Sequence, residues 1–430
     1  MSRPSNSPRN IIVILADDLG YGDLGCDGGT IIRTPNLDRM AAEGTRLSDF
    51  YASANLCTPS RAGLLTGRYA IRLGLADQVI QASETRGLPT TELTIPKALK
   101  ATHATALIGK WHLGHNGDHW PPTVHGFDTF KGLPYSHDMQ PLAHYEKVGD
   151  GPLTERPADF PKLTETFFHD ALAFAEENRD RPFFVLLALT APHVPLVRND
   201  DAKWDSPGGA YGDVVEEIDR NVGTLLERLK ALGLDEDTLV VFTSDNGPWF
   251  EGSSGPFRDR KGGAGWDGGY RVPCILRQPG TIPAGQTSNA ISSNLDFLPT
   301  FAALTGTSLP EGLELDGKDL SAVILDGAAS PHEAIILFDN AKVAAVRTQD
   351  WKFVTRCYFR AYEINVGRFN YPLLFDINRD PGENYSVASL HPDVLAALKD
   401  RHSAARAFYE PMTKAFPPYV RPSAADWHPD

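Results

Sequence analysis

Four short apolar runs along the chain each end immediately before charged or polar residues. They cover residues 11–15, 104–108, 183–189 and 239–242. Each has the length and the β-branched or aromatic content of a strand, and each is apolar throughout instead of alternating with polar residues. A continuously apolar strand is typical of a sheet that is covered on both faces. We therefore expect these runs to form a buried, mostly parallel sheet.

Amphipathic helices are expected between these strands. Thr34 and Pro35 suit an N-cap and a first helical position, and Gly44 suits the end of that helix. Residues 214–232 carry an apolar stripe at helical spacing and are followed by Gly233, a typical helix end. The alternation of strands and helices predicts an α/β fold, with a doubly wound, mostly parallel sheet flanked by helices.

The pattern changes near residue 330. Residues 334–338, 344–347 and 351–355 predict short strands, and no long helical segments separate them. Strands in that arrangement favour an antiparallel sheet. We expect a catalytic α/β domain over residues 1–330 and a smaller C-terminal α+β domain over residues 331–430, with an antiparallel sheet and a C-terminal segment that wraps around it.

The chain is acidic, with 41 Lys and Arg against 55 Asp and Glu and a net charge of −14. This balance argues against a surface for nucleic acid or anionic membranes. No apolar run reaches the roughly 18–20 residues that span a bilayer. The first ten residues lack the apolar stretch of a secretory signal, so we expect a cytoplasmic protein, or a periplasmic or secreted one if a signal has been removed. The oligomeric state has no signal in the sequence.

Polar residues follow all four predicted strands. Lys110 and His112 follow the second strand, His193 follows the third, and acidic pairs follow the first and the fourth. Doubly wound sheets bind their ligands beyond the carboxyl ends of the strands. The convergence of these residues from four separate segments therefore indicates a catalytic site at that edge of the sheet.

The two acidic pairs, Asp17-Asp18 and Asp245-Asn246, are candidate metal ligands. Their carboxylate and amide oxygens suit Ca²⁺ or Mg²⁺ better than zinc. Such pairs are also common in turns. Because both pairs end a buried strand, we expect one divalent cation, with Ca²⁺ as the first choice and Mg²⁺ as the alternative.

Cys57 opens a second candidate site segment, residues 57–68. Pro59 and Ser60 suit the first turn of a helix, whose free N–H groups favour anions. Arg61 follows Cys57 by four residues, so both side chains share one helix face. A lone cysteine is usually a buried, inert thiol. Here its sulfur would also be a poor partner for a hard cation, so an oxygen nucleophile suits the position better.

The segment Cys-x-Pro-Ser-Arg, followed by Leu-Thr-Gly-Arg, resembles the signature of the type I sulfatases. That resemblance covers nearly the whole chain, and residues 132–138 look like the branch that contains arylsulfatase A and the N-acetylgalactosamine-6-sulfatases. It implies an alkaline-phosphatase-like fold. Four further segments carry it: residues 10–23, 109–114, 242–247 and 374–383.

The resemblance also implies a function: hydrolysis of a small-molecule or sugar sulfate ester, of arylsulfatase type, through a covalent sulfo-enzyme intermediate. A formylglycine-generating enzyme would oxidise Cys57 to Cα-formylglycine, whose hydrate would be nucleophile and metal ligand beside Asp17, Asp18, Asp245 and Asn246. Arg61 would steady the hydrate. The residues that would surround the sulfate are Lys110, His112, Ser136, His193 and Lys261. Among these, His193 and Lys261 would lie at the leaving-group oxygen, and His112 would help to regenerate the aldehyde.

One segment departs from the family pattern. Where the family has Glu-Gly-Gly after its lysine, this chain has Asp267 and one extra residue between it and Lys261. Arg258 or Arg260 could therefore stand in for Lys261. The glycines of the segment match a dinucleotide-binding spacing, but no buried strand precedes them and no helix follows, so we reject that interpretation.

Two other functions remain open from the sequence. The same scaffold could carry a phosphomonoesterase, phosphodiesterase or phosphonate hydrolase, or the protein could bind sulfated ligands without catalysis and keep Cys57 as a thiol. The acidic surface favours a small ester over a sulfated polysaccharide. Among the tryptophans, Trp111, Trp249 and Trp266 are expected to serve packing more than to form a substrate platform, although Trp249 closely follows the second acidic pair.

Overall fold

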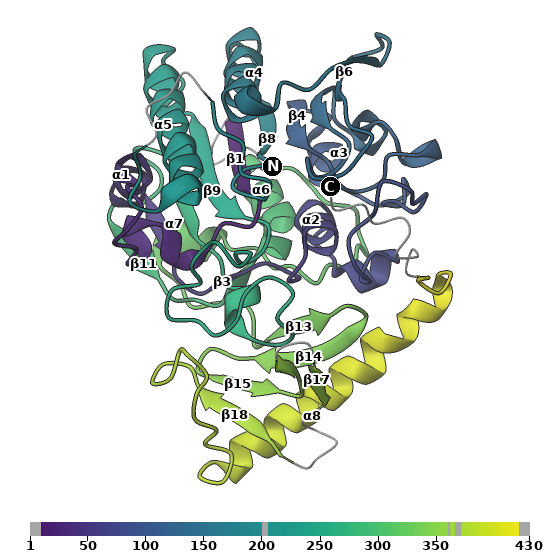
Figure 1. The fold of residues 1–430 in the computed structure, drawn as a ribbon, viewed down its shortest axis with the longest axis vertical. Helices are drawn as coiled ribbons and strands as arrows, with labels where there is room; N and C mark the ends of the chain where they lie inside the picture. Colours follow the sequence, from purple (N-terminus) through teal and green to yellow (C-terminus); the bar gives the residue numbers. More distant parts are fainter. Residues whose placement is uncertain (1–9, 200–204, 360–361, 366–370, 421–430) are drawn as a thin grey trace.

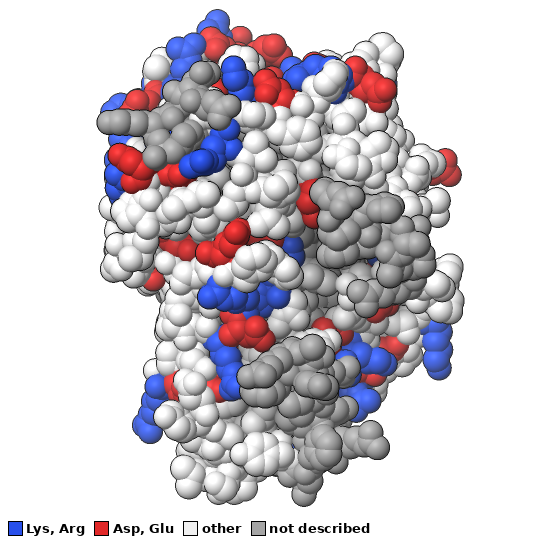
Figure 2. Space-filling view, viewed as in Figure 1, with Lys and Arg blue, Asp and Glu red and all other residues white. Residues whose placement is uncertain are grey.

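The computed structural model describes residues 10–199, 205–359, 362–365 and 371–420. A large sheet with helices on both faces makes up most of the molecule, and a smaller sheet with one long helix lies beside it (Figure 1). Among the described residues, no helix is both long and apolar enough to cross a membrane. Acidic and basic side chains are interspersed over the face shown in Figure 2, without a continuous basic patch.

The four strands predicted from the apolar runs form the centre of the large sheet. They are β9 (Thr238–Ser244), β1 (Asn10–Ala16), β8 (Phe183–Ala188) and β4 (Ala104–Lys110), side by side in that order. Each is parallel to its neighbour in this group. Because every residue in the four strands is buried, the prediction of a sheet covered on both faces is confirmed.

Shorter strands, which the sequence did not predict, extend the sheet at both edges. On one side lie β10 (Cys274–Arg277), β2 (Thr45–Leu47) and β11 (Gln286–Ser288); on the other lie β5 (Thr129–Leu133), β6 (His144–Val148) and β7 (Thr154–Arg156). The pairs β9–β10, β10–β2, β5–β6 and β6–β7 are antiparallel. A separate two-stranded pair joins β3 (Phe50–Tyr51) to β12 (Ser292–Ser293).

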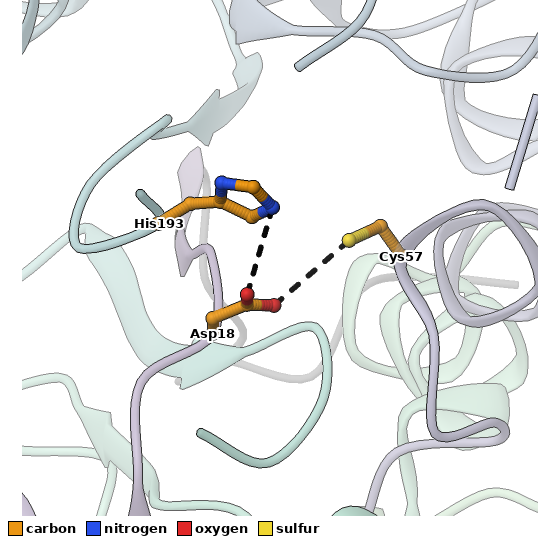
Figure 3. A group of neighbouring side chains, drawn as sticks. All are labelled: Asp18, Cys57 and His193. Carbon is orange, nitrogen blue, oxygen red and sulfur yellow. Dashed lines mark hydrogen bonds and ion pairs between the residues drawn. The ribbon is translucent and has the colours of Figure 1, made fainter. Parts of the chain in front are cut away.

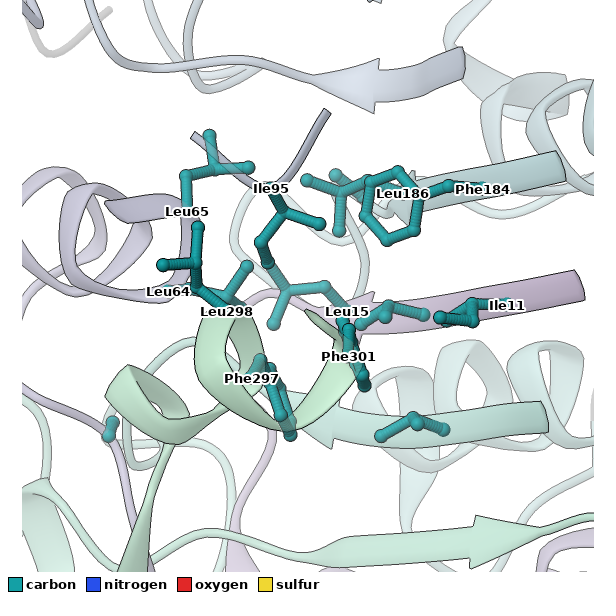
Figure 4. Packing of buried hydrophobic residues seen from close by; sticks show 14 of the residues in the cluster. Ile11, Leu15, Leu64, Leu65, Ile95, Phe184, Leu186, Phe297, Leu298 and Phe301 are labelled. Carbon is teal, nitrogen blue, oxygen red and sulfur yellow. The ribbon is translucent and has the colours of Figure 1, made fainter. Parts of the chain in front are cut away.

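Helices cover both faces of the large sheet. The side chains of β1 alternate between these two faces. Ile12 and Ile14 pack into one core with α1 (Pro35–Ala42), α4 (Leu163–Glu177) and α5 (Gly209–Ala231). Ile11, Val13 and Leu15 face the opposite core (Figure 4). The helices of that second core are α2 (Cys57–Thr66), α3 (Ile95–Leu99), α6 (Phe297–Thr305) and α7 (Ser321–Asp326).

The start of α1 differs from the prediction in one respect. Thr34 occupies the N-cap position, but its hydroxyl donates to Asp38 (3.1 Å) and does not cap the helix. The free N–H groups of Asn36 and Leu37 instead donate to the carboxylate of Asp219 on α5, at 3.0 and 2.8 Å. A carboxylate at a helix N-terminus is favourable, so this contact joins the two helices.

The smaller sheet contains the three predicted C-terminal strands. They are β13 (Ile335–Asp339), β14 (Lys342–Arg347) and β15 (Trp351–Val354), and β18 (Leu373–Asp376) is added beyond β15. All neighbours in this sheet are antiparallel, as expected. The helix α8 (Pro392–Tyr409) packs against it, and β16 (Arg356–Phe359) with β17 (Tyr362–Asn365) forms a hairpin. The division of the chain at residue 330 stays a prediction.

A buried ion cluster joins the two sheets. The ammonium of Lys352, on β15, lies 2.5 Å from Asp267 and 2.7 Å from Glu383, and all three side chains are fully buried. The carboxylate of Asp267 also accepts from the hydroxyl of Tyr51 on β3 (2.8 Å). Arg347, at the end of β14, donates to the same hydroxyl (2.8 Å). The smaller sheet therefore supplies two cations to buried carboxylates of the preceding part of the chain: Lys352 to Asp267, which lies between β9 and β10, and Arg347 to Asp49 (2.7 Å).

We expect Lys352→Met to lower the free energy of unfolding by about 3–5 kcal/mol, because it removes the ammonium that lies between two buried carboxylates. Chemical denaturation and the thermal midpoint measure the effect. The matched control is Lys342→Met on β14, which removes an exposed ion pair to Glu410 and should cost less than about 1 kcal/mol. Equal effects of the two substitutions would contradict a structural role for the buried cluster.

Candidate active site

The predicted site residues gather at the carboxyl ends of the central strands. Asp17 and Asp18 follow β1, Asp245 and Asn246 follow β9, and Lys110 is the last residue of β4. Asp18 adopts a positive φ of 65°, which turns the chain directly after β1. Its backbone N–H then donates to the carboxylate of Asp245 (3.2 Å). The two acidic pairs are therefore neighbours, as the topology predicted.

The acidic residues form a cluster with Cys57. One ligand atom from each of Asp17, Asp18, Cys57 and Asp245 lies within 4.8 Å of the others, and all four residues are buried. Asn246 donates its amide to Asp18 (2.8 Å), while its side-chain oxygen has no hydrogen-bond partner in the part of the chain that the structure describes. A buried oxygen without a partner, beside three carboxylates, fits a hard divalent cation.

Cys57 is the first residue of α2, and its side chain points into the acidic cluster. Its sulfur lies 3.5 Å from Asp17 and 3.9 Å from Asp18, and the residue is 1% exposed. Figure 3 shows Cys57, Asp18 and His193 facing one another from three separate segments. Burial raises the pKa of the Cys57 thiol well above its usual value, with Lys110 and Lys261 opposing that shift.

Each carboxylate of the cluster has its own cation. Lys110 lies 2.6 Å from Asp17, and Lys261 lies 2.7 Å from Asp18. Arg61, one turn after Cys57 on α2, lies 2.8 Å from Asp245. Three cations buried together in a chain of net charge −14 go against its overall charge, and each of them is matched by a carboxylate of the cluster.

These charges give two neighbouring carboxyls, Asp17 and Asp245, different pKa values. Burial alone would raise the pKa of Asp17, but Lys110, His193 and Arg61 outweigh it and hold that pKa well below its usual range. Burial and repulsion from Asp17 raise the pKa of Asp245 to about 6. The protein's own cations thus stabilise Asp17 as an anion more strongly than Asp245.

Two histidines lie at the site. His112 is buried, and burial together with Lys110 holds its pKa well below the usual value, so the ring is neutral. Its Nε2 faces the carbonyl oxygen of Ile80 (3.0 Å) and therefore carries the proton, which leaves Nδ1 without a partner as an acceptor. His193 follows β8, and its Nε2 lies 3.6 Å from Asp18.

Ser136 is the predicted site residue that the structure ties least closely to the others. It lies beyond β5, is 1% exposed, and its hydroxyl has no hydrogen-bond partner among the described residues. The ring of the adjacent His137 lies 5.9 Å from that of His193. A buried hydroxyl without a partner near His193 suits a contact to a bound anion.

The structure places Lys261 at the site and leaves neither arginine to replace it. The N–H of Lys261 donates to the carbonyl oxygen of Pro248 (2.9 Å), directly after the second acidic pair. Arg258 donates to the carbonyl oxygen of Glu383 and lies over the ring of Trp266. Arg260 donates to backbone carbonyl oxygens, among them that of Phe250 (2.9 Å). Asp267 belongs to the buried ion cluster.

Sequence reasoning missed some residues that connect the site. Ser244, the last residue of β9, accepts from the N–H of Leu19 (3.0 Å) and donates to the carbonyl oxygen of Asn246 (2.9 Å), so it ties the two acidic loops together. Thr58 donates to the carbonyl oxygen of His112 (2.9 Å). In the sequence, the sole sign of a role for Ser244 and Thr58 was a hydroxyl next to a candidate ligand, Asp245 or Cys57. Lys352 had none, because its partner Asp267 is remote in sequence, and Glu383 stood out only as the end of the segment 374–383.

Comparison with known proteins gives one consistent result. The sulfatase family model matches residues 9–307, and the model for the C-terminal region of aryl-sulfatase matches residues 330–427. Arylsulfatase A of Homo sapiens is 39% identical over 91% of this chain and 86% of its own length, and steryl-sulfatase of Mus musculus is 33% identical over 99% and 86%. The PsFucS1 sulfatase from Pseudoalteromonas sp. superimposes with a TM-score of 0.86 at 29% identity, over 94% of this chain and 91% of its own. With the acidic cluster, its cations and Cys57 in one site, the chain belongs to the sulfatase family and is a sulfuric ester hydrolase.

Proposed function

We propose that this sulfatase hydrolyses small sulfate esters of the arylsulfatase type through residue 57 in the form of Cα-formylglycine, beside one divalent cation. The position of the Cys57 sulfur, 3.5 Å from Asp17 within the acidic cluster, carries the proposal. Sulfur is a soft ligand, whereas carboxylates select hard cations. An oxygen at this position suits both the cation and an attack on sulfur.

The cation would be held by Asp17, Asp18, Asp245 and Asn246. We choose Ca²⁺ over Mg²⁺ because Ca²⁺ accepts a site made mostly of protein oxygens, whereas Mg²⁺ usually keeps several waters. When bound, the cation supplies Lewis-acid chemistry to the oxygens around it. The side-chain oxygen of Asn246, which has no other partner, supports its inclusion among the ligands.

As a formylglycine hydrate, residue 57 would supply one hydroxyl oxygen to attack sulfur and a second hydroxyl whose deprotonation releases sulfate and restores the aldehyde. His112 suits the second step, because its Nδ1 is an acceptor without a partner. A formylglycine-generating enzyme is the partner that this form of residue 57 requires.

The cations around the cluster would bind the sulfuryl group and stabilise the transition state. Lys110, Arg61 and Lys261 approach from three sides of the acidic cluster, and such positioned charges contribute roughly 3–4 kcal/mol each. His193 and Lys261 share Asp18 as a neighbour, so both would lie at the leaving-group oxygen. A proton donated there by His193 accelerates departure of the alcohol or phenol by about 10²–10⁴-fold.

The state of residue 57 provides the first test. We expect mass spectrometry of the peptide that contains it to show an aldehyde in place of the thiol. Cys57→Ala and Cys57→Ser should both lose turnover of 4-nitrophenyl sulfate by roughly 10⁴-fold or more, because neither has two hydroxyls. The matching phosphate monoester and diester should be poor substrates. Full activity with an intact thiol would refute the mechanism.

Removal of the cation provides a second test with two readouts. EDTA should abolish activity and lower the thermal midpoint, and added Ca²⁺ should restore both. Ligand binding at about 100 times its Kd stabilises the folded state by about 2.7 kcal/mol. The variant Asn246→Ala should lose most of the Ca²⁺-dependent shift of the midpoint. A midpoint that responds to neither EDTA nor Ca²⁺ would exclude a cation at this site.

Lys110→Met tests the charge on the sulfuryl oxygens. We expect kcat to fall by about 10²–10³-fold, because the ammonium next to Asp17 is lost. The thermal midpoint in Ca²⁺ should change little, since the cation still compensates the carboxylates. A variant that loses its fold together with its activity would show that Lys110 is structural.

A further inference from the structure

Two aromatic side chains are exposed directly after the second acidic pair. Trp249 is 40% exposed and Phe250 is 66% exposed, whereas Trp111 and Trp266 are 2% exposed. The packing role expected for Trp249 is therefore wrong, while that of the other two is confirmed. Single exposed apolar residues are ordinary, but two adjacent large rings beside a site point to a ligand.

The aromatic pair lies at the opening of the site. The ring of Trp249 lies 5.8 Å from the ammonium of Lys261, which in turn lies 2.7 Å from Asp18. The side chains of Lys261 and His193 are each 9% exposed, whereas those of Lys110 and Asp17 are fully buried. Solvent therefore reaches the site from the side of Lys261 and His193, where the Trp249 ring is found.

The backbone that carries the rings is held in place by a charged side chain. One nitrogen of Arg260 donates to the carbonyl oxygens of Trp249 (3.2 Å), Phe250 (2.9 Å) and Gly252. The two rings contact each other at 5.5 Å between centroids, tilted by 54°. The pair is thus preorganised, and binding against it costs little additional ordering.

We propose that Trp249, supported by Phe250, binds the leaving group of the sulfate ester and selects uncharged aromatic alcohols. The inference rests on the proposed function, which puts the leaving-group oxygen at His193 and Lys261. A group attached to that oxygen extends toward solvent past Trp249. A flat aromatic ring stacks there at the separations that aromatic pairs prefer.

The polar groups near the rings favour an aromatic leaving group over a sugar. Arg260, which holds the backbone of the two rings, is engaged with carbonyl oxygens. Sugar hydroxyls require free hydrogen-bonding groups at defined positions, in addition to a ring face. Glu251 is exposed on the same loop and repels a second sulfate or a carboxylate in the leaving group.

Kinetics with paired esters test the inference. For Trp249→Ala, we expect kcat/KM for 4-methylumbelliferyl sulfate to fall about tenfold, mainly through KM, because the stacking surface is lost. For propyl sulfate and glucose 6-sulfate, the change should stay below about twofold, since neither stacks as an aromatic ring does. Trp249→Phe should restore most of the aryl activity. For each ester, kcat/KM of the variant is divided by kcat/KM of the wild type, so that the intrinsic reactivity of the ester cancels.

The control is Tyr385→Ala, which removes an aromatic ring that is 77% exposed outside the site. Calorimetric binding of 2-naphthalenesulfonate and methanesulfonate adds a readout that needs no turnover. The naphthalene compound should bind Trp249→Ala about tenfold more weakly, with methanesulfonate unchanged. Equal losses for aryl and propyl esters, or a larger loss for glucose 6-sulfate, would overturn the inference. If the wild type turns over none of the esters but still binds 2-naphthalenesulfonate about tenfold more tightly than Trp249→Ala does, only the proposed function is refuted.

Discussion

The active site depends on compensating the negative charge of three buried carboxylates. Asp17, Asp18 and Asp245 are at most 1% exposed, and an unpaired charge at such depth is strongly unfavourable. Each carboxylate is therefore matched by a cation, namely Lys110, Lys261 or Arg61. The arrangement that stabilises the folded protein also brings the carboxylates suited to a divalent cation next to the cations suited to the negatively charged sulfate ester.

Two unusual backbone conformations near the site help to place its charged and polar side chains. Gly109 precedes Lys110 and has a φ of 110°; a Cβ there would lie 1.9 Å from the carbonyl oxygen of Ala188 on the next strand. Only glycine allows β4 to approach β8 so closely just before the strand ends. His112 also adopts a positive φ, of 60°, which is uncommon outside glycine and costs conformational free energy. The chain accepts this strain where it turns functional side chains inward.

Much of the fold and of the site could be predicted from the sequence, for specific physical reasons. Apolar runs such as residues 239–242 predicted the central strands because burial on both faces leaves no alternation. The site followed from topology, because parallel strands bring their carboxyl ends to one edge. The edge strands, such as β7, are too short and polar to leave a pattern. Lys352 was hidden within an apolar strand, and its partner Asp267 had been read as a departure from the site motif. The exposure of Trp249 depends on the conformation of its loop, which Arg260 holds through hydrogen bonds. The local sequence does not encode that conformation.

The buried position of α2 has a consequence for the order of events during synthesis. All ten residues of α2 are buried, so the enzyme proposed to oxidise residue 57 would have to reach it before that helix packs against the sheet. The last charged partners of the buried cluster, Lys352 and Glu383, leave the ribosome some 300 residues after Cys57. Until they arrive, Asp267 lacks the ammonium of Lys352, its shortest ion pair. Conversion of residue 57, as proposed above, and completion of the buried cluster would thus be separated in time by the length of the chain between them.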